Sequence, residues 1–264
     1  ADDDKKYYDG DTVILEKAGA TGAFADKTVA NNKAVTISGL TLSGEDAGNY
    51  TVTDNSGATA NITAKAITST GITASNKVYN ANTVATLNTG TAVLTGGAVA
   101  DDDNKYYTGD TVTLDTSGAA GLFADKTVAN NKAVTISGLT LSGEDAGNYT
   151  VTDASNATAN ITAKPITATG VTAVNKIYNA NTVATLNTGL AAITAGATAD
   201  DDKKYYDGDT VILEKAGATG AFADKTVANN KAVTISGLTL SGEDAGNYTV
   251  TDNSGATADI TAKA

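Results

Sequence analysis

The chain has 264 residues, a formal net charge of −12 and a sequence pI near 4.3, and it contains no His, Cys, Met, Trp or Arg. Without Cys or His it lacks a thiol nucleophile, an imidazole base, a disulfide and a zinc site of ordinary composition. An acidic chain without Arg offers no basic face for nucleic acid, and no apolar run approaches the roughly 20 residues that span a bilayer. We therefore expect no enzyme activity, no nucleic-acid partner and no membrane insertion.

An internal repeat determines the domain organisation. Phe24, Phe123 and Phe222 recur every 99 residues, and the tyrosines Tyr50, Tyr149 and Tyr248 keep the same step. This period predicts an incomplete repeat over 1–65, which lacks its first strands, and complete repeats over 66–164 and 165–264. The missing strands leave a sheet edge uncovered. Either the chain is a window cut from a longer array, or a neighbouring molecule supplies those strands.

In chain order, the middle period reads as a series of short strands. Apolar and polar residues alternate over 110–114, 134–141, 148–152 and 157–162, with a one-residue slip at Gly138 that predicts a bulge or kink. Turn-forming stretches such as DTSG, ANN and DASN separate these runs, and no segment has a sustained helical period. The pattern predicts an all-β fold, with each period of about 99 residues forming an antiparallel β-sandwich.

The stretch ISGLTLSGEDAGNYTV occurs three times without change, beginning at residues 37, 136 and 235. It resembles the corner between strands E and F of immunoglobulin-like domains, in which a Tyr hydroxyl bonds to backbone a few residues upstream. The resemblance implies a cysteine-free immunoglobulin-like sandwich. Its structural residues would be Tyr50, Tyr149, Tyr248, Asp46, Asp145, Asp244, Gly48, Gly147 and Gly246.

The passage from one period to the next, ANITAKPITATG, contains almost no Gly or Ser and only Pro165 as a break. Flexible linkers are rich in Gly and Ser. A last strand that runs directly into the next first strand predicts repeats arranged as an elongated, stiff rod, with contacts mainly between neighbours.

Longer segments resemble the YDG-type repeats of large secreted bacterial adhesins, including filamentous-haemagglutinin-like exoproteins. KVYNANTVATL stands where that family has K-x-Y-D-G-T-T-x-A, and FADKTVANNKAVTISGLTLSGEDAGNYTVT and ATANITAK follow. The chain departs from the motif after Tyr79, where Asn80 and Ala81 replace Asp-Gly. The resemblance implies an extracellular protein, secreted or held at a bacterial cell surface. In such proteins the repeats act as a stalk or spacer.

The acidic runs at 2–4, 101–103 and 200–202 suggest a calcium site, because hard cations take several carboxylates from a loop. The alternative is a solvated acidic turn that keeps the array soluble. No other cofactor is expected. The candidate calcium ligands in the middle period are Asp101, Asp102, Asp103, Asp110, Glu144 and Asp145.

Two side-chain hypotheses remain. Lys126 or Lys132 with Asn160 could form an intramolecular isopeptide crosslink, or these could be ordinary surface residues. One ring of the Tyr106–Tyr107 pair is expected to point outward, where it would cover a contact between domains or stack on sugars.

The expected partners are neighbouring repeats of the same protein, a further copy through filament formation or strand donation, and surface glycans. The leading functional expectation is a structural stalk or fibre segment of an adhesin, and a glycan- or host-surface-binding module is the alternative.

Overall fold

The computed structural model describes residues 6–264 as short β-strands joined by turns, with no α-helix in that range. Three single 3-10 turns are formed by the repeated AGN sequence: η1 (Ala47–Asn49), η2 (Ala146–Asn148) and η3 (Ala245–Asn247). The all-β prediction is confirmed. None of the helical segments within 6–264 has the length and apolar character to cross a membrane.

The chain divides into two compact units. The first comprises the residues up to Thr70 together with Ala92–Ser117 and Leu139–Ala154, and the second comprises Gly71–Thr91, Gly118–Gly138 and the chain from Ser155 onward. Both sets of boundaries fall inside the second 99-residue period, so the compact units do not coincide with the sequence repeats. Each unit instead contains one junction between successive periods.

The first unit is made of four small sheets, with strand orders β1-β4, β2-β3-β5, β11-β6-β16 and β12-β15. Their bounds are β1 (Ile14–Glu16), β2 (Thr21–Phe24), β3 (Ala30–Ser38), β4 (Thr41–Ser43), β5 (Thr59–Ile62), β6 (Lys65–Thr70), β11 (Val93–Leu94), β12 (Thr113–Asp115), β15 (Thr140–Ser142) and β16 (Tyr149–Asp153).

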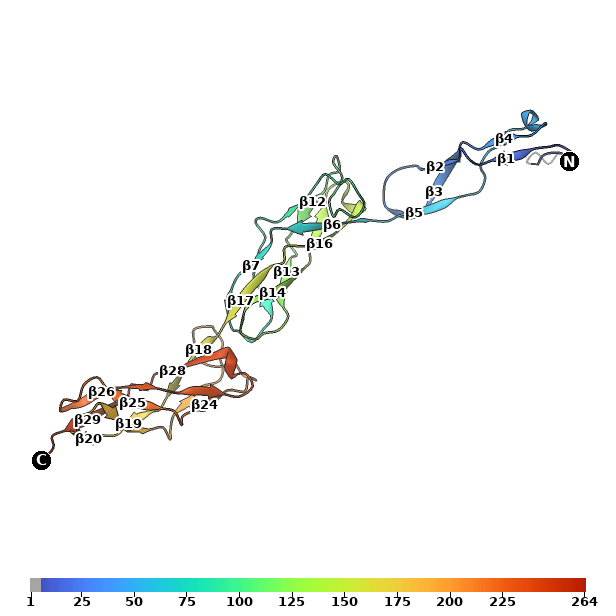
Figure 1. The fold of residues 1–264 in the computed structure, drawn as a ribbon. Coiled ribbons are helices and arrows are strands. Elements are labelled where there is room, and N and C mark those ends of the chain that lie inside the picture. Colours follow the sequence, from blue (N-terminus) through green and yellow to red (C-terminus); the bar gives the residue numbers. More distant parts are fainter. Residues whose placement is uncertain (1–5) are drawn as a thin grey trace. The chain divides into compact units, whose positions relative to one another are not determined.

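The second unit holds two five-stranded sheets, β8-β17-β14-β13-β9 and β20-β29-β26-β25-β21, together with the smaller sheets β23-β18-β28, β10-β7, β19-β22 and β24-β27. In Figure 1, β13, β14 and β17 run side by side. The bounds are β7 (Thr73–Ala74), β8 (Lys77–Val78), β9 (Val84–Ala85), β10 (Leu87–Asn88), β13 (Ala120–Phe123), β14 (Ala129–Ser137), β17 (Thr158–Thr162), β18 (Lys164–Thr169), β19 (Thr172–Ala173), β20 (Lys176–Ile177), β21 (Val183–Ala184), β22 (Leu186–Asn187), β23 (Ala192–Ile193), β24 (Ile212–Glu214), β25 (Thr219–Phe222), β26 (Ala228–Ser236), β27 (Thr239–Ser241), β28 (Tyr248–Asp252) and β29 (Thr257–Thr261).

Four of the described sheets contain a parallel pair of strands, so the prediction of purely antiparallel sheets is wrong. The first strand of each period lies parallel to a late strand of the same period: β6 pairs with β16, and β18 pairs with β28. Later in the same periods, β8 pairs parallel with β17, and β20 pairs parallel with β29. Alternation of apolar residues reports which face a strand buries, but it carries no information about strand direction.

The expected slip at Gly138 is a break between two strands and not a bulge within one. Gly138 has a φ of +76° and separates the end of β14 from the start of β15. The register shift occurs earlier in β14, between Ala129 and Lys132, where Asn131 has a φ of +52°. The alternation of apolar and polar residues indicated a break in the strand pattern, but it could not show at which residues the register shifts.

The buried core of the second unit continues across its junction between periods. Tyr79, Phe123 and Ile161 from the second period pack in one cluster with Ile166 and Tyr248 from the third. A second cluster, built on Phe222 and Ile260, lies within the third period. Both clusters contain several alanines, so the apolar area that each residue buries is modest. The junction is thus part of the core and not a linker between cores.

A substitution at Gly237 tests the close approach of its backbone to that of Gly217 in the second unit. It has a φ of +76°, and a Cβ at this position would lie 2.1 Å from the carbonyl oxygen of Gly217. We expect Gly237→Ala to lower the free energy of unfolding by about 2 kcal/mol or more, because left-handed strain and a backbone clash add. Urea denaturation followed by far-UV circular dichroism measures this change.

The matched control is Gly246→Ala, which has no heavy atom within 4 Å of the added Cβ. Equal destabilisation by the two substitutions would contradict the proposed cause.

Candidate functional site: the junction between repeats

The junctions are formed by chain segments with almost no connecting residues. β17 ends at Thr162 and β18 begins at Lys164, so one residue separates the last strand of one period from the first strand of the next. The junction in the first unit is similar, with β5 ending at Ile62 and β6 beginning at Lys65. These short connections hold the side chains of adjacent periods close together, and they confirm that almost no residues separate the last strand of one period from the first strand of the next.

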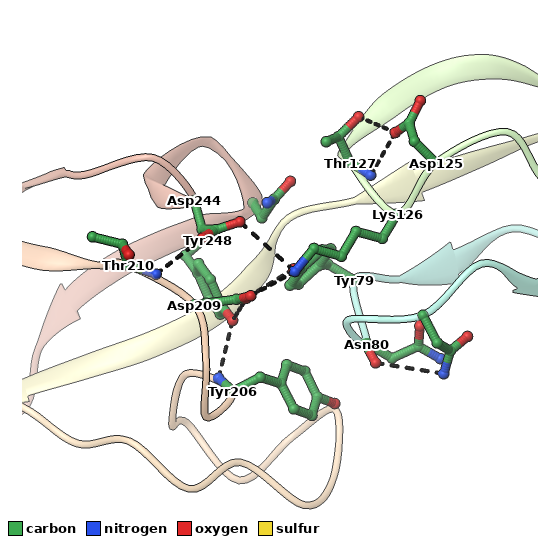
Figure 2. Close-up of polar contacts among 12 residues, drawn as sticks. Tyr79, Asn80, Asp125, Lys126, Thr127, Tyr206, Asp209, Thr210, Asp244 and Tyr248 are labelled. Atoms are coloured by element: carbon green, nitrogen blue, oxygen red, sulfur yellow. Dashed lines mark hydrogen bonds and ion pairs between the residues drawn. The ribbon is translucent and has the colours of Figure 1, made fainter.

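The carboxylate of Asp209 lies at the centre of the junction in the second unit. Its Oδ2 accepts hydrogen bonds from the hydroxyls of Tyr248 at 2.6 Å and Tyr79 at 2.7 Å. Its Oδ1 accepts from the Lys126 ammonium at 2.7 Å. Figure 2 shows these donors converging on the carboxylate. We call Tyr79, Lys126, Asp209 and Tyr248 the junction cluster.

The members of the junction cluster come from both periods. Tyr79 and Lys126 belong to the second period, whereas Asp209 and Tyr248 belong to the third. The Tyr79 side chain is fully buried, and its ring packs edge-to-face on Tyr248 with centroids 5.4 Å apart. A buried carboxylate is costly unless donors satisfy it. The third period therefore depends on the second for two of the three side-chain donors to Asp209.

Further contacts fix the same junction. The Lys126 ammonium also lies 3.8 Å from the Asp244 carboxylate, and the backbone N–H of Val128 donates to the Asn247 side-chain oxygen at 3.0 Å. Asp244 in turn accepts from the backbone N–H of Thr210 at 2.9 Å. The GEDAGN turn of the third period thus binds one loop of the second period through a side chain and a backbone group.

A buried lysine connects the strands at this junction. Lys164 is fully buried, and its ammonium donates to the Ala199 carbonyl and, at 2.9 Å, to Asp202. The Asp202 carboxylate also accepts backbone N–H groups from Thr198, Ala199 and Lys204. The third Asp of the acidic run therefore neutralises the lysine that ends the second period and begins β18.

Burial and hydrogen bonding shift the titration of the junction cluster. Burial alone would raise the pKa of Asp209, but the hydrogen bonds from Lys126, Tyr248 and Tyr79 outweigh it and lower that pKa. Burial raises the pKa of Tyr79 to about 12, and Asp209 adds to this increase. The hydrogen bond to Asp209 raises the pKa of Lys126. The arrangement favours an ionised Asp209, a protonated Lys126 and neutral tyrosines at neutral pH.

The junction in the first unit has the same contacts of an aspartate with a tyrosine and a lysine. Tyr149 donates to Asp110 Oδ2 at 2.6 Å, and Lys27 lies 2.5 Å from Asp110 and 3.0 Å from Asp145. The backbone N–H of Val29 donates to Asn148, as Val128 does to Asn247. Two independent junctions of one chain thus use the same contacts.

In the repeated GEDAGNY sequence, the tyrosine has a different hydrogen-bond partner from the one that the immunoglobulin-like resemblance implies. The hydroxyl of Tyr149 bonds to the Asp110 carboxylate and accepts from the backbone N–H of Tyr107, 42 residues upstream. Tyr50 and Tyr248 have equivalent partners. The predicted partner, backbone a few residues upstream, is therefore wrong. The reason is that the tyrosine packs against a loop that the sequence alone does not place beside it.

The aspartates and glycines predicted for this corner also have defined positions. Asp46, Asp145 and Asp244 precede the 3-10 turns, and each accepts a backbone N–H at 2.9 Å, from Thr12, Thr111 and Thr210 respectively. Gly48, Gly147 and Gly246 lie inside those turns with open space beside them. The aspartates thus fasten the turn, whereas the structure imposes no steric requirement for these three glycines.

The acids predicted as calcium ligands do not converge. Within 6–264 no group of three or more acidic side chains is arranged to hold a metal ion. Asp103 accepts the N–H groups of Val99, Ala100 and Lys105, whereas Asp110 and Asp145 bind Lys27. Asp101 accepts from the Tyr107 hydroxyl at 2.9 Å. The arrangement of Asp101, Asp102, Asp103, Asp110, Glu144 and Asp145 therefore does not support a calcium site, and residues 2–4 lie outside the described range.

The lysines considered for a crosslink have ionic partners instead. Lys132 binds Asp125, and Lys126 binds Asp209. Asn160 accepts from the backbone N–H of Asn131 at 2.8 Å. Neither lysine is bonded to Asn160, so the crosslink hypothesis has no geometric support.

Sequence reasoning missed the roles of Tyr79, Asp209 and Lys164. Each recurs at the 99-residue step, as Tyr178, Asp110 and Lys65, and this recurrence was the available signal. It could not reveal the contact, because Tyr79 and Asp209 are 130 residues apart and belong to different periods.

Removing one hydroxyl tests the junction cluster. Tyr248→Phe takes a donor from Asp209 and an acceptor from the Tyr206 N–H. We expect a loss of about 1–3 kcal/mol in the free energy of unfolding, because a buried charged group loses a hydrogen bond. Urea denaturation measures it. The control Tyr205→Phe keeps the neighbouring ring, and a loss of the same size in that variant would contradict the role given to Tyr248.

The shifted pKa values predict stability limits at both ends of the pH scale. The lowered pKa of Asp209 contributes stability that is complete above its unfolded value of about 4 and is lost as pH falls through the folded pKa. The raised pKa of Tyr79 contributes stability that is lost as pH rises from about 10 to about 12. Urea denaturation across pH 2.5–12 should show both losses.

In Asp209→Asn the free energy of unfolding should fall less steeply as the pH is lowered. Asp207→Asn, which changes an exposed carboxylate two residues away, should leave this pH dependence unchanged. An acid limb that is identical in the wild type and Asp209→Asn would refute the assignment.

The model of the YDG domain matches residues 2–58, 63–158 and 162–256, which follow the three periods of the sequence. No curated protein and no solved structure matches the chain. Because the three matches together cover most of its length, the chain belongs to the YDG domain family.

Proposed function

We propose that the chain is a structural stalk or fibre segment of an extracellular bacterial adhesin, which spaces or assembles a surface filament and performs no catalysis. The observation that carries the proposal is the junction cluster. Bending at this junction would expose the buried Tyr79 ring and separate Asp209 from two of its donors. Domains joined by small interfaces ordinarily move relative to one another. A buried polar contact reinforced by a one-residue connection opposes that motion, as a stiff spacer requires.

The extracellular setting rests on the family. YDG-type repeats of the kind that this sequence resembles occur in large secreted adhesins, and the chain contains three matches to the YDG domain. The acidic composition and the absence of Cys suit a long repeat array that must fold outside the cell without disulfides. Each period, as an immunoglobulin-like sandwich, would form one segment of an elongated rod.

A glycan- or host-surface-binding module is the second candidate. It is favoured by Tyr7 and Tyr8, which are 57% and 69% exposed. Tyr7 borders a cleft of about 550 Å³ that is also lined by Lys6, Asp54 and Asn55. An exposed aromatic ring beside carboxylate and amide groups can stack on a sugar and hydrogen-bond its hydroxyls.

Small-angle X-ray scattering tests the stalk. Chains carrying one, two and three extra copies of residues 66–164 should show a maximum dimension that increases by a constant increment per copy. The control has a Gly-Ser insertion between Thr162 and Lys164, which separates the strands at the junction, and should scatter as a flexible chain. Growth with the square root of the copy number in the unmodified series would reject a stiff stalk.

Calorimetric titration with surface glycans separates the two candidates. The stalk predicts no saturable binding. Saturable binding that is lost in Tyr7→Ala, with the melting temperature unchanged, would favour the adhesive module.

A further inference from the structure

A buried lysine and an aspartate lie in contact beneath the acidic loop of the third period. The side chain of Lys164, at the start of β18, has no exposed surface, and its Nζ lies 2.9 Å from Oδ1 of Asp202. The carbonyl of Ala199 accepts a second hydrogen bond from the same ammonium, and the ring of Tyr206 lies 5.4 Å from it. The ammonium is therefore shielded from water and held against one carboxylate.

The two oxygens of the Asp202 carboxylate have different donors. Oδ2 accepts the backbone N–H groups of Thr198 at 2.6 Å and Ala199 at 3.1 Å. Oδ1 accepts from the lysine and from the backbone N–H of Lys204 at 3.1 Å. Two N–H groups fixed on one oxygen form the arrangement that stabilises developing negative charge in acyl transfer. One oxygen thus has donors suited to an oxyanion, and the other contacts the group that can supply protons.

The first unit contains the same arrangement. Nζ of Lys65 lies 3.0 Å from Oδ1 of Asp103, and Oδ2 accepts the backbone N–H groups of Val99 at 2.7 Å and Ala100 at 3.2 Å. The Tyr107 ring lies 5.4 Å from this ammonium. The two loops differ in sequence, AVADDDNK over 98–105 and ATADDDKK over 197–204, yet the contacts between lysine, aspartate and backbone are the same.

A buried ion pair is an expensive way to hold a fold together. Burial alone would raise the pKa of Asp202, but the backbone N–H groups and Lys164 lower that pKa, so the resting state is a charged pair. Apolar side chains of similar volume often stabilise an interior as well as such a pair does. A reaction that removes both charges would eliminate the cost of keeping them away from water.

We propose that Lys164 and Asp202 condense to an intramolecular isopeptide bond once the chain has folded, and that Lys65 and Asp103 do the same. A bond forms between Lys164 Nζ and Asp202 Cγ, and the bond between Cγ and Oδ1 breaks. A proton first passes from the ammonium to Oδ1, which frees the lone pair of Nζ. The amine attacks Cγ, and the two N–H groups stabilise the charge on Oδ2. A second proton then passes from Nζ to Oδ1, which leaves as water.

The reaction is balanced by the ion pair alone. The ammonium begins with three protons, of which two leave in the water and one remains on the amide nitrogen. The positive and negative charges disappear together, and no oxidant, metal or second substrate takes part. Groups held in contact react as if at an effective concentration of about 10⁵ M or more. This proximity favours condensation, and hydrolysis is opposed because water is excluded from the lysine.

The bond ties the start of β18 to the loop that precedes β24. Lys164 and Asp202 are 38 residues apart in the sequence. A covalent link across such a stretch restricts the unfolded chain, as a disulfide does, and this chain has no cysteine with which to form one. The reaction occurs once per pair and has no turnover. It depends on the local geometry and not on the stalk function.

Mass spectrometry of the full chain tests the proposal. A protease that cleaves after Glu isolates each pair within one peptide, the first in residues 46–144 and the second in residues 145–214. Each peptide should be lighter than its sequence by the mass of one water. Tandem fragmentation should release no separate fragments by cleavage between the joined residues, because the bond keeps the two parts together.

Substitutions identify the residues that lose the water. Lys164→Arg keeps the positive charge but removes the amine, and Asp202→Ala removes the carbon that is attacked. Either variant should restore the full mass of peptide 145–214 and leave peptide 46–144 light. Lys65→Arg should have the converse effect. Circular dichroism shows whether each variant is folded.

Lys132→Arg is the matched control. Lys132 also pairs with an aspartate, Asp125, at 2.5 Å, but the Asp125 side chain is 56% exposed. This variant should leave the water loss of both peptides unchanged.

Peptide 145–214 at full mass in the wild type would overturn the proposal. Water loss that persists in Lys164→Arg would also overturn it, because the water would then come from other residues. If Lys164→Arg fails to fold, the fragmentation pattern of the wild-type peptide still decides between the two outcomes. Full mass of peptide 46–144 alone would overturn the bond between Lys65 and Asp103.

Discussion

The structure depends on one buried carboxylate at each junction between periods. Removing a carboxylate from water is costly, and the cost is offset only when donors surround it closely. At Asp209 the donors are one tyrosine of the same period, and a tyrosine and a lysine of the preceding period. Folding of one period and docking of its neighbour are therefore coupled through a single side chain. This coupling explains why the compact units of the chain each contain a junction and cut through the second period.

The core buries few large apolar side chains, so the hydrogen-bonded side chains at the junctions are needed for stability. Large apolar side chains are scarce, and many of the buried residues are alanines, including Ala159, Ala168 and Ala258. Little apolar area per residue is then available for stabilisation. Hydrogen-bonded side chains replace part of it: Lys164 is buried against Asp202 and a carbonyl, and each Tyr of the GEDAGNY turn holds an aspartate. Close backbone contacts at glycine, such as Gly237 on Gly217, bring the strands near enough for the small side chains to pack.

Identical sequence does not give identical environments in this chain. Phe24 and Phe123 lie in the same motif, yet one is half-exposed and the other buried, because a segment from the front of the period covers only the second. Tyr79 is buried differently, by the following period, whose Asp209 accepts its hydroxyl. In repeat proteins the neighbour completes the site. The chemistry of a repeat is therefore a property of pairs of periods.

The amino-acid sequence alone determined the all-β class, the 99-residue period, the near absence of linkers and the family. These features follow from the local alternation of apolar and polar residues, from turn-forming residues and from the internal repeat, all of which can be read from the amino-acid sequence. The tertiary structure decided the rest. Strand direction, the partners of Tyr149 and the pairing of acids with lysines all depend on segments tens of residues apart meeting in space. The acidic run is one example: its spacing suggested a metal, but Asp103 binds three backbone N–H groups and Lys65. Tyr79 is another, because its hydroxyl reaches Asp209 130 residues away, and local pattern cannot encode a contact between periods.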